Sequence, residues 1–159
     1  MVMVHDRLYI GDVGTCQPSS DLLAVVHACK SPCHQRSVGY TGSLSPMHPN
    51  YLVLRDPYDL YLNIIDPPVP LIKIETFVQF LLFAGEHHDR GAFVLIHCNQ
   101  GESRAPTLAH LFLAKHLRVI PNGSFSDAKT VFACLYAGYR PGAGIQQFLT
   151  TNWVMVEGN

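Results

Sequence analysis

Five residues separate Cys98 from Arg104 in the sequence. These two side chains are the ones best suited to react with a phosphate ester. A cysteine thiolate is a strong nucleophile. The planar guanidinium of an arginine can grip two oxygens of a phosphate and hold the negative charge that builds in a transition state. Gly101 lies between them, where the lack of a side chain permits close approach of the backbone to a bound group. Together these residue types indicate phosphoryl transfer to sulfur.

The residues around this pair predict a strand, a turn and a helix in succession. Residues 92–96 form a continuous apolar run of strand length, which is typical of a central strand covered on both faces. Helical periodicity runs from Pro106 to residue 117, and proline is favoured in a first helical turn because its missing N–H has no partner there. The N–H groups of such a turn and helix end point at an anion and favour a thiolate. We therefore predict an anion site at residues 98–104.

The remaining patterns predict alternating strands and helices. Residues 7–10, 22–27, 51–54 and 61–65 are short and apolar, although 22–27 also fits a helix that turns into a strand. Helices are expected at 72–86, from 126 to 139 and from 144 to 153. Residues 30–50, rich in Ser, Pro, His and Gly, predict a long loop, and the three prolines in 66–70 predict an irregular segment. The expected fold is a single α/β domain over residues 1–159, with a central, mostly parallel sheet flanked by helices and the catalytic loop between a central strand and a helix N-terminus.

Composition narrows the classes of protein. The 159 residues are 48% hydrophobic and 14% charged, enough for one sizeable core. Eleven Lys and Arg against twelve Asp and Glu give a net charge of -1, which disfavours nucleic acid and anionic membranes as partners. No apolar stretch approaches the roughly 18 residues of a membrane span, and the first residues lack a signal-peptide pattern. Five cysteines, an odd count, suit a reducing compartment. We expect a monomer in the cytoplasm.

The residues around Cys98 resemble the signature of the protein tyrosine phosphatase superfamily, a His-Cys pair followed by five residues and an Arg. The phosphate-binding loop that this resemblance implies consists of His97, Cys98, Asn99, Gln100, Gly101, Glu102, Ser103 and Arg104. Residues 105–107, 8–11, 61–64, 126–128, 140–141 and 144–145 resemble stretches of the dual-specificity branch. The resemblance implies the phosphatase fold and hydrolysis of phosphate monoesters, in proteins or in small phosphate esters, without a metal or other cofactor.

The resemblance also implies roles for individual residues. Cys98 attacks phosphorus to form a phosphocysteine, while Arg104 and the loop N–H groups hold the equatorial oxygens. His97 orients the loop and supports the thiolate by hydrogen bonding, without acting as a base. Asp66, which lies 32 positions before Cys98 and follows a strand, matches the family's general acid. Asp59 and Asp56 are the alternatives.

One residue departs from the family pattern. Relatives carry Ser or Thr directly after the Arg, where a hydroxyl donates a hydrogen bond to the cysteine sulfur, but this chain has Ala105. We expect breakdown of the phosphocysteine to be slow as a result, unless the hydroxyl of Ser103 replaces the missing donor. Glu102 at the rim disfavours polyanionic substrates such as inositol polyphosphates, provided that its carboxylate faces the site.

Several further side chains have two interpretations, one as functional residues and one as residues without a functional role. Arg36 is either a secondary anion contact or a solvated cation, and Gln146 either positions water near the loop or lies on a helix surface. A metal site is not expected, because the Cys and His residues between 27 and 34 match no standard zinc spacing. Cys29 or Cys33 could instead form a reversible disulfide with Cys98.

Two other functions stay open at this stage. The chain could be a phosphate-reading module whose turnover is impaired by Ala105, or a phosphatase of a nucleotide or RNA end. The balanced charge argues against the second of these alternatives. Turnover of a panel of phosphorylated substrates separates all three.

Overall fold

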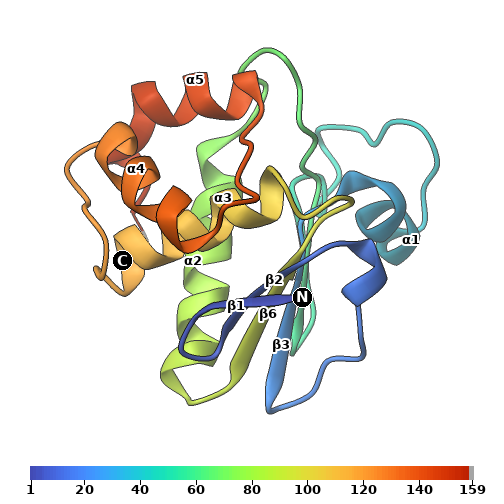
Figure 1. Cartoon of the computed structure of the whole chain (residues 1–159). Coiled ribbons are helices and arrows are strands. Elements are labelled where there is room, and N and C mark those ends of the chain that lie inside the picture. Colours follow the sequence, from blue (N-terminus) through green and yellow to red (C-terminus); the bar gives the residue numbers. More distant parts are fainter. Residues whose placement is uncertain (158–159) are drawn as a thin grey trace.

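The chain folds around a six-stranded sheet, seen in a computed structural model that describes residues 1–157 (Figure 1). The strand order is β1-β2-β6-β3-β5-β4. The four inner strands are parallel, and the edge strands β1 and β4 pair antiparallel to their neighbours. The strands are β1 (Val2–His5), β2 (Leu8–Gly11), β3 (Leu23–His27), β4 (Val53–Arg55), β5 (Asp59–Leu62) and β6 (Phe93–His97). The predicted α/β fold with a central, mostly parallel sheet is therefore confirmed.

Helices cover both faces of this sheet (Figure 1). The larger group, α2 to α5, lies on one side, while α1 and the short helical segment η2 lie on the other. The helices are α1 (Gln35–Val38), α2 (Ile74–Asp89), α3 (Arg104–Leu111), α4 (Phe125–Leu135) and α5 (Ala143–Asn152), with short segments η1 (Val13–Thr15), η2 (Lys30–His34), η3 (Phe112–His116) and η4 (Trp153–Met155). Within residues 1–157, no helix is both long and apolar enough to cross a membrane.

The core lies between the sheet and the larger group of helices. Strand β6 is hydrogen-bonded to β2 and β3 and is apolar along its length, as expected for a parallel strand buried on both faces. Five fully buried phenylalanines fill the space between sheet and helices: Phe77, Phe80, Phe83, Phe112 and Phe132. Because β6 is fixed on all sides, the residues that follow it start from a well-defined position.

The structure corrects several predicted boundaries. Residues 23–27 form a strand and not a helix, because parallel pairing with β5 and β6 overrides their ambiguous pattern. The predicted loop 30–50 is irregular only after residue 38, since η2 and α1 occupy residues 30–38. Helix α4 ends at Leu135 and not at residue 139, because Tyr136 leaves helical geometry with φ −136° and ψ 91°. Strand β1 was not predicted.

Candidate active site

Cys98 follows β6 directly and lies at the centre of the loop that leads into α3. Its side chain is buried, with 1% of the residue exposed. Its N–H donates a hydrogen bond to the Gly11 carbonyl at 3.3 Å, which ties the start of the loop to the end of β2. Its sulfur accepts the Gly101 N–H at 3.3 Å. The loop thus turns a backbone donor towards the thiol, as the strand, turn and helix pattern predicts.

Gly101 allows the loop to make this turn. Its φ of +72° lies in the left-handed region, which residues with a side chain rarely adopt. A Cβ at this position would lie 3.2 Å from the Gly11 carbonyl oxygen, closer than an ordinary contact. Both the backbone conformation and the close approach therefore require glycine.

Arg104 is the first residue of α3, and its guanidinium is held at two points. Nη2 donates to Oδ1 of Asn99 at 2.7 Å, and Nη1 donates to the Ile64 carbonyl at 3.4 Å. Nε is buried and has no hydrogen-bond partner among residues 1–157. A buried donor without an acceptor is costly, and an oxyanion seated over the loop would supply one. The bond to Asn99 ties the guanidinium to the residue that follows Cys98.

The connection between α4 and α5 clamps the outer side of the loop. The Tyr136 hydroxyl donates to the Gly101 carbonyl at 2.9 Å, and the Arg140 N–H donates to the Glu102 carbonyl at 2.7 Å. These bonds satisfy two loop carbonyls on the outer side, so the loop N–H groups on the inner side can face an anion. The Glu102 side chain is exposed.

Ser103 and Asp66 both contact Gly142, in the connection between α4 and α5. The Ser103 oxygen accepts the Gly142 N–H at 2.9 Å, and no hydrogen bond joins this hydroxyl to the Cys98 sulfur among the described residues. The Asp66 carboxylate is exposed and lies against Gly142, where any side chain at residue 142 would collide with its oxygens. The Pro67 carbonyl accepts the Gly144 N–H at 3.1 Å and anchors the proline-rich segment to α5. Asp66 therefore lies at the outer edge of the loop, next to the residue bonded to Ser103.

His97, at the end of β6, contacts a second histidine. Its Nε2 lies 2.7 Å from Nδ1 of His27, while its Nδ1 is buried without a hydrogen-bond partner among the described residues. Burial lowers the pKa of His97 to about 4, and the neighbouring His27 adds to the shift, so the ring is neutral at pH 7. The hydrogen bond to the Cys98 sulfur comes from Gly101.

Asp59, one of the alternative acids, lies 2.9 Å from Nε2 of His27, so its carboxylate is occupied by this contact.

Three solved structures have the same fold as this chain. A structure of DUSP15 matches with a TM-score of 0.66 at 16% identity, covering 96% of this chain and 86% of that one. Human DUSP28 matches with a TM-score of 0.64 at 16% identity, covering 98% and 97% of the two chains. Human tyrosine phosphatase-like serine/threonine/tyrosine-interacting protein matches with 0.66 at 16% identity, covering 96% and 95%. The fold is that of the dual-specificity phosphatases.

Sequence comparison gives no corresponding match. No protein-family model matches the chain, and no curated protein does. The likeness to the dual-specificity phosphatases thus lies in the backbone fold, at 16% identity.

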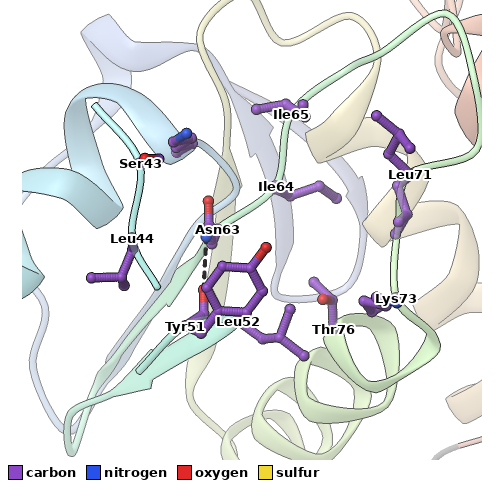
Figure 2. A pocket seen from close by; sticks show the side chains of 12 residues that line it. Ser43, Leu44, Tyr51, Leu52, Asn63, Ile64, Ile65, Leu71, Lys73 and Thr76 are labelled. Atoms are coloured by element: carbon purple, nitrogen blue, oxygen red, sulfur yellow. Dashed lines mark hydrogen bonds between the residues drawn. The ribbon is translucent and has the colours of Figure 1, made fainter. Parts of the chain in front are cut away.

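A cavity of about 330 Å³ lies beside the segment that precedes α2 (Figure 2). Half of its twelve lining residues are Leu or Ile, and Tyr51, Asn63, Lys30 and Lys73 are among the others. Ile64 joins it to the site, because its side chain lines the cavity and its carbonyl accepts Arg104. Sequence patterns did not identify this cavity, whose walls come from residues 30 to 76.

The two secondary residues proposed from sequence lie outside the loop. Arg36 is exposed in α1 and lines a shallow depression together with Ser31, whose carbonyl accepts the Asn99 side chain at 3.0 Å. Gln146 is held by Lys129, which donates to its oxygen, and by its own donation to the Pro141 carbonyl at 3.0 Å. Arg36 therefore lies near Ser31, which contacts the loop. The Gln146 side chain is held by Lys129 and Pro141, outside the loop.

Cys29 and Cys33 lie near His97, where the two sulfurs and one ring nitrogen are within 4.8 Å of one another. The neighbouring Cys33 thiol lowers the pKa of Cys29, and the Arg104 guanidinium contributes to the same shift, whereas the Cys29 thiol and burial raise the pKa of Cys33. His34 is turned away, since it bonds to Tyr40 and to the Asn50 carbonyl. A disulfide to Cys98 stays a prediction.

Proposed function

We propose that the chain is a cysteine-dependent phosphatase that hydrolyses phosphate monoesters, with phosphotyrosine in proteins as a substrate and phosphoserine or phosphothreonine as further ones. The observation that carries the proposal is that the short loop between β6 and α3 begins with Cys98 and leads into Arg104. The sulfur accepts a loop N–H, and the guanidinium has a buried Nε–H without a partner among the described residues. This combination of nucleophile and oxyanion holder is what phosphoryl transfer to sulfur needs.

The reaction proceeds in two steps. In the first, the Cys98 thiolate attacks phosphorus, the ester oxygen leaves, and Asp66 gives that oxygen its proton. In the second, water attacks the phosphocysteine, Asp66 takes a proton from the water, and Cys98 leaves as thiolate with release of inorganic phosphate. Arg104 and the loop N–H groups hold the three equatorial oxygens in both steps. The position of Asp66 against Gly142, which is bonded to Ser103 of the loop, supports its role.

The substrate class follows from the surroundings of the loop. The cavity that Ile64 lines has a largely apolar wall with Lys30 and Lys73, which suits an extended peptide with acidic groups near the phosphorylated residue. The exposed carboxylate of Glu102 disfavours polyanionic small molecules. Cysteines without disulfides among the described residues fit work in a reducing compartment such as the cytoplasm.

Turnover by matched variants tests the proposal. Wild type is expected to hydrolyse para-nitrophenyl phosphate and phosphotyrosyl peptides, and Cys98→Ser is expected to abolish both activities. Cys134→Ser, which changes an exposed thiol on α4, is the matched control and should leave turnover unchanged. Retained turnover in Cys98→Ser would refute the proposal.

The role of Asp66 has its own test. Asp66→Asn should slow hydrolysis of phenyl phosphate more than that of para-nitrophenyl phosphate, because the better leaving group needs less protonation. Equal losses on both substrates would contradict a general acid at Asp66. The same pair of substrates applied to Asp56→Asn serves as a control from the neighbouring segment.

A second candidate function is supported by the residues around the sulfur. Ala105 offers no hydroxyl, and the Ser103 oxygen is engaged with Gly142. A chain of this kind could hold a phosphorylated residue without releasing phosphate, and the human phosphatase-like interacting protein has the same fold. Tight phosphopeptide binding by wild type with negligible turnover would favour this function. Inclusion of 5′-phosphorylated RNA in the panel covers the third alternative.

A further inference from the structure

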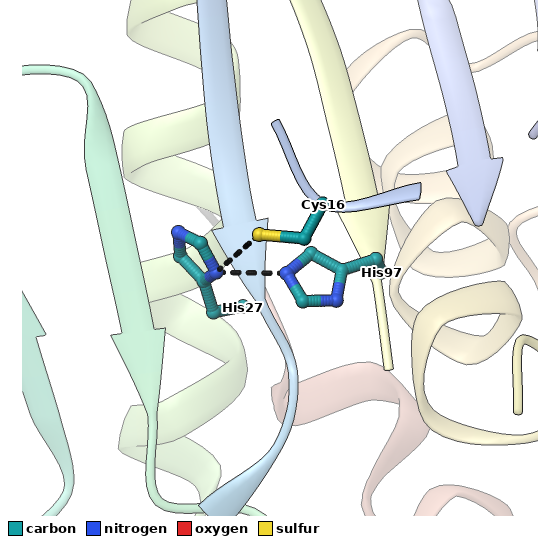
Figure 3. A group of neighbouring side chains, drawn as sticks. All are labelled: Cys16, His27 and His97. Carbon is teal, nitrogen blue, oxygen red and sulfur yellow. Dashed lines mark hydrogen bonds between the residues drawn. The ribbon is translucent and has the colours of Figure 1, made fainter. Parts of the chain in front are cut away.

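Cys16, His27 and His97 converge next to the catalytic loop, although they are far apart in sequence (Figure 3). Cys16 comes from the segment after η1, and the two histidines are the last residues of β3 and β6. His27 and His97 are register partners in neighbouring parallel strands, which places their rings side by side. The sulfur and one nitrogen of each ring lie within 4.8 Å of one another. Cys16 Sγ lies 3.8 Å from His27 Nδ1, which lies 2.7 Å from His97 Nε2.

The His27 ring is fixed so that Nδ1 faces the other two side chains. Its Nε2 lies 2.9 Å from an oxygen of Asp59, and the Tyr61 ring stacks on it at 4.2 Å with an interplanar angle of 8°. Histidines that ligate metals commonly donate their second N–H to a carboxylate, which fixes the ring and leaves the other nitrogen as a lone pair. Asp59 does this for His27.

Hydrogen bonds alone leave the cluster incomplete. With the Nε2 proton of His27 shared with Asp59, His27 Nδ1 carries a lone pair and the proton between the two rings belongs to His97 Nε2. His97 Nδ1 is fully buried with no hydrogen-bond partner among residues 1–157, so it can take up this proton. An ion that enters between the rings then binds His27 Nδ1 and His97 Nε2.

We propose that Cys16, His27 and His97 bind a divalent transition-metal ion, with zinc the best match to one thiolate and two imidazoles. Zinc sites with three protein ligands keep a fourth position for water, and Cys16 is exposed, so water can reach that side. With Zn–N of about 2.0–2.1 Å and Zn–S of about 2.3 Å in a tetrahedron, the nitrogens lie about 3.3 Å apart and nitrogen and sulfur about 3.5 Å. The rings therefore separate slightly on binding, and the thiol moves closer.

A second set of ligands competes for the same histidine. Cys29 and Cys33 also lie within 4.8 Å of His97. His97 Nε2, however, lies 2.7 Å from His27 Nδ1 and is directed at that ring. The set that includes His27 has the supporting carboxylate, so it is the one we assign, and the alternative is an outcome of the test.

Cobalt binding to the reduced, chelator-treated protein tests the proposal. We expect one Co²⁺ per chain, a near-ultraviolet band from thiolate-to-cobalt charge transfer, and displacement of that band by Zn²⁺. Binding of the ion releases the Cys16 thiol proton, so the affinity should rise with pH while that thiol stays protonated in the free protein. Asp59→Asn should weaken binding about 10–100-fold.

Single variants decide which residues bind. Cys16→Ser should remove the charge-transfer band, and since Cys16 is exposed this change should not impair folding. Cys134→Ser and Cys98→Ser should both retain the band, the first as a control for an unrelated thiol and the second to exclude the catalytic sulfur as ligand. A band that persists in Cys16→Ser, a band lost in Cys29→Ser or Cys98→Ser, or binding of less than one ion per chain by wild type would overturn the proposal.

Discussion

Ala105→Ser should accelerate the second half of the reaction. In the structure the Cys98 sulfur accepts the Gly101 N–H, while the Ser103 oxygen is engaged with Gly142. The leaving thiolate therefore lacks the hydroxyl donor that the dual-specificity pattern places after the arginine. We expect breakdown of the phosphocysteine to limit turnover in the wild type, and a serine at residue 105 to relieve that limit.

The size of the effect follows from the strength of one hydrogen bond. A hydrogen bond to a charged group contributes about 1.5–3 kcal/mol. Since about 1.4 kcal/mol corresponds to a factor of ten in rate, breakdown should become about 10–150 times faster. Ala105 is fully buried, so the added oxygen should also lower the free energy of unfolding, by about 1–3 kcal/mol if the core must shift.

Rapid mixing with an aryl phosphate separates the two steps. Wild type should release a burst of phenol of nearly one equivalent per chain, followed by slow turnover. Ala105→Ser should show a smaller burst and faster steady-state turnover. Ala109→Ser is the matched control, because Ala109 is equally buried one helical turn further along α3 and pays the same burial cost. Linear phenol release from the start by wild type, or equal steady-state rates for the two serine variants, would refute the reasoning.

Three further predictions concern the support of the site and the core. Tyr136→Phe removes the hydrogen bond to the Gly101 carbonyl and should lower the free energy of unfolding by about 0.5–1.5 kcal/mol, measured by urea denaturation. Gly101→Ala, at φ +72° and 3.2 Å from the Gly11 carbonyl, should destabilise the loop by about 1–2 kcal/mol and abolish the phenol burst while far-ultraviolet circular dichroism stays unchanged. Burial, with a contribution from Lys129, lowers the pKa of His110 to about 3, below its ordinary 6.5. The unfolded chain therefore binds a proton at this residue more readily than the folded protein does. Below pH 6.5 the free energy of unfolding should fall by up to about 1.4 kcal/mol per pH unit, until the pH reaches about 3. Urea midpoints at pH 7.5 and 5 should therefore differ less in His110→Phe than in wild type, and a His48→Gln control should not reduce the difference.

The strand, turn and helix around Cys98 could be predicted because their pattern is local. A buried strand, a glycine and a proline in the first turn of α3 lie within 15 residues and position Cys98 and Arg104. The Asp66 position could be predicted only in part. Its place after a strand is visible in the sequence, but its packing against Gly142 depends on α5, which is 76 residues further along the chain.

Other features depended on contacts that sequence patterns do not encode. Strand β1 has four residues, mostly exposed, at the edge of the sheet, so its pattern is too short to distinguish from a loop. The Cys16, His27 and His97 cluster was missed because it depends on the register of β3 against β6. A spacing pattern within residues 27–34 includes neither a cysteine before β3 nor a histidine at the end of β6.

The loop and the strand beneath it should differ in how easily they open. Strand β6 is hydrogen-bonded on both sides, so its amides should exchange with solvent only when the whole domain unfolds. The loop that follows is held by single bonds, among them those that Tyr136 and Arg140 donate to the Gly101 and Glu102 carbonyls and the one that Asn99 donates to the Ser31 carbonyl. These bonds can break without loss of any strand pairing, so the loop amides should exchange faster than those of β6. Cys98 thus directly follows a strand that should stay closed, while the residues after it belong to a segment that should open more easily.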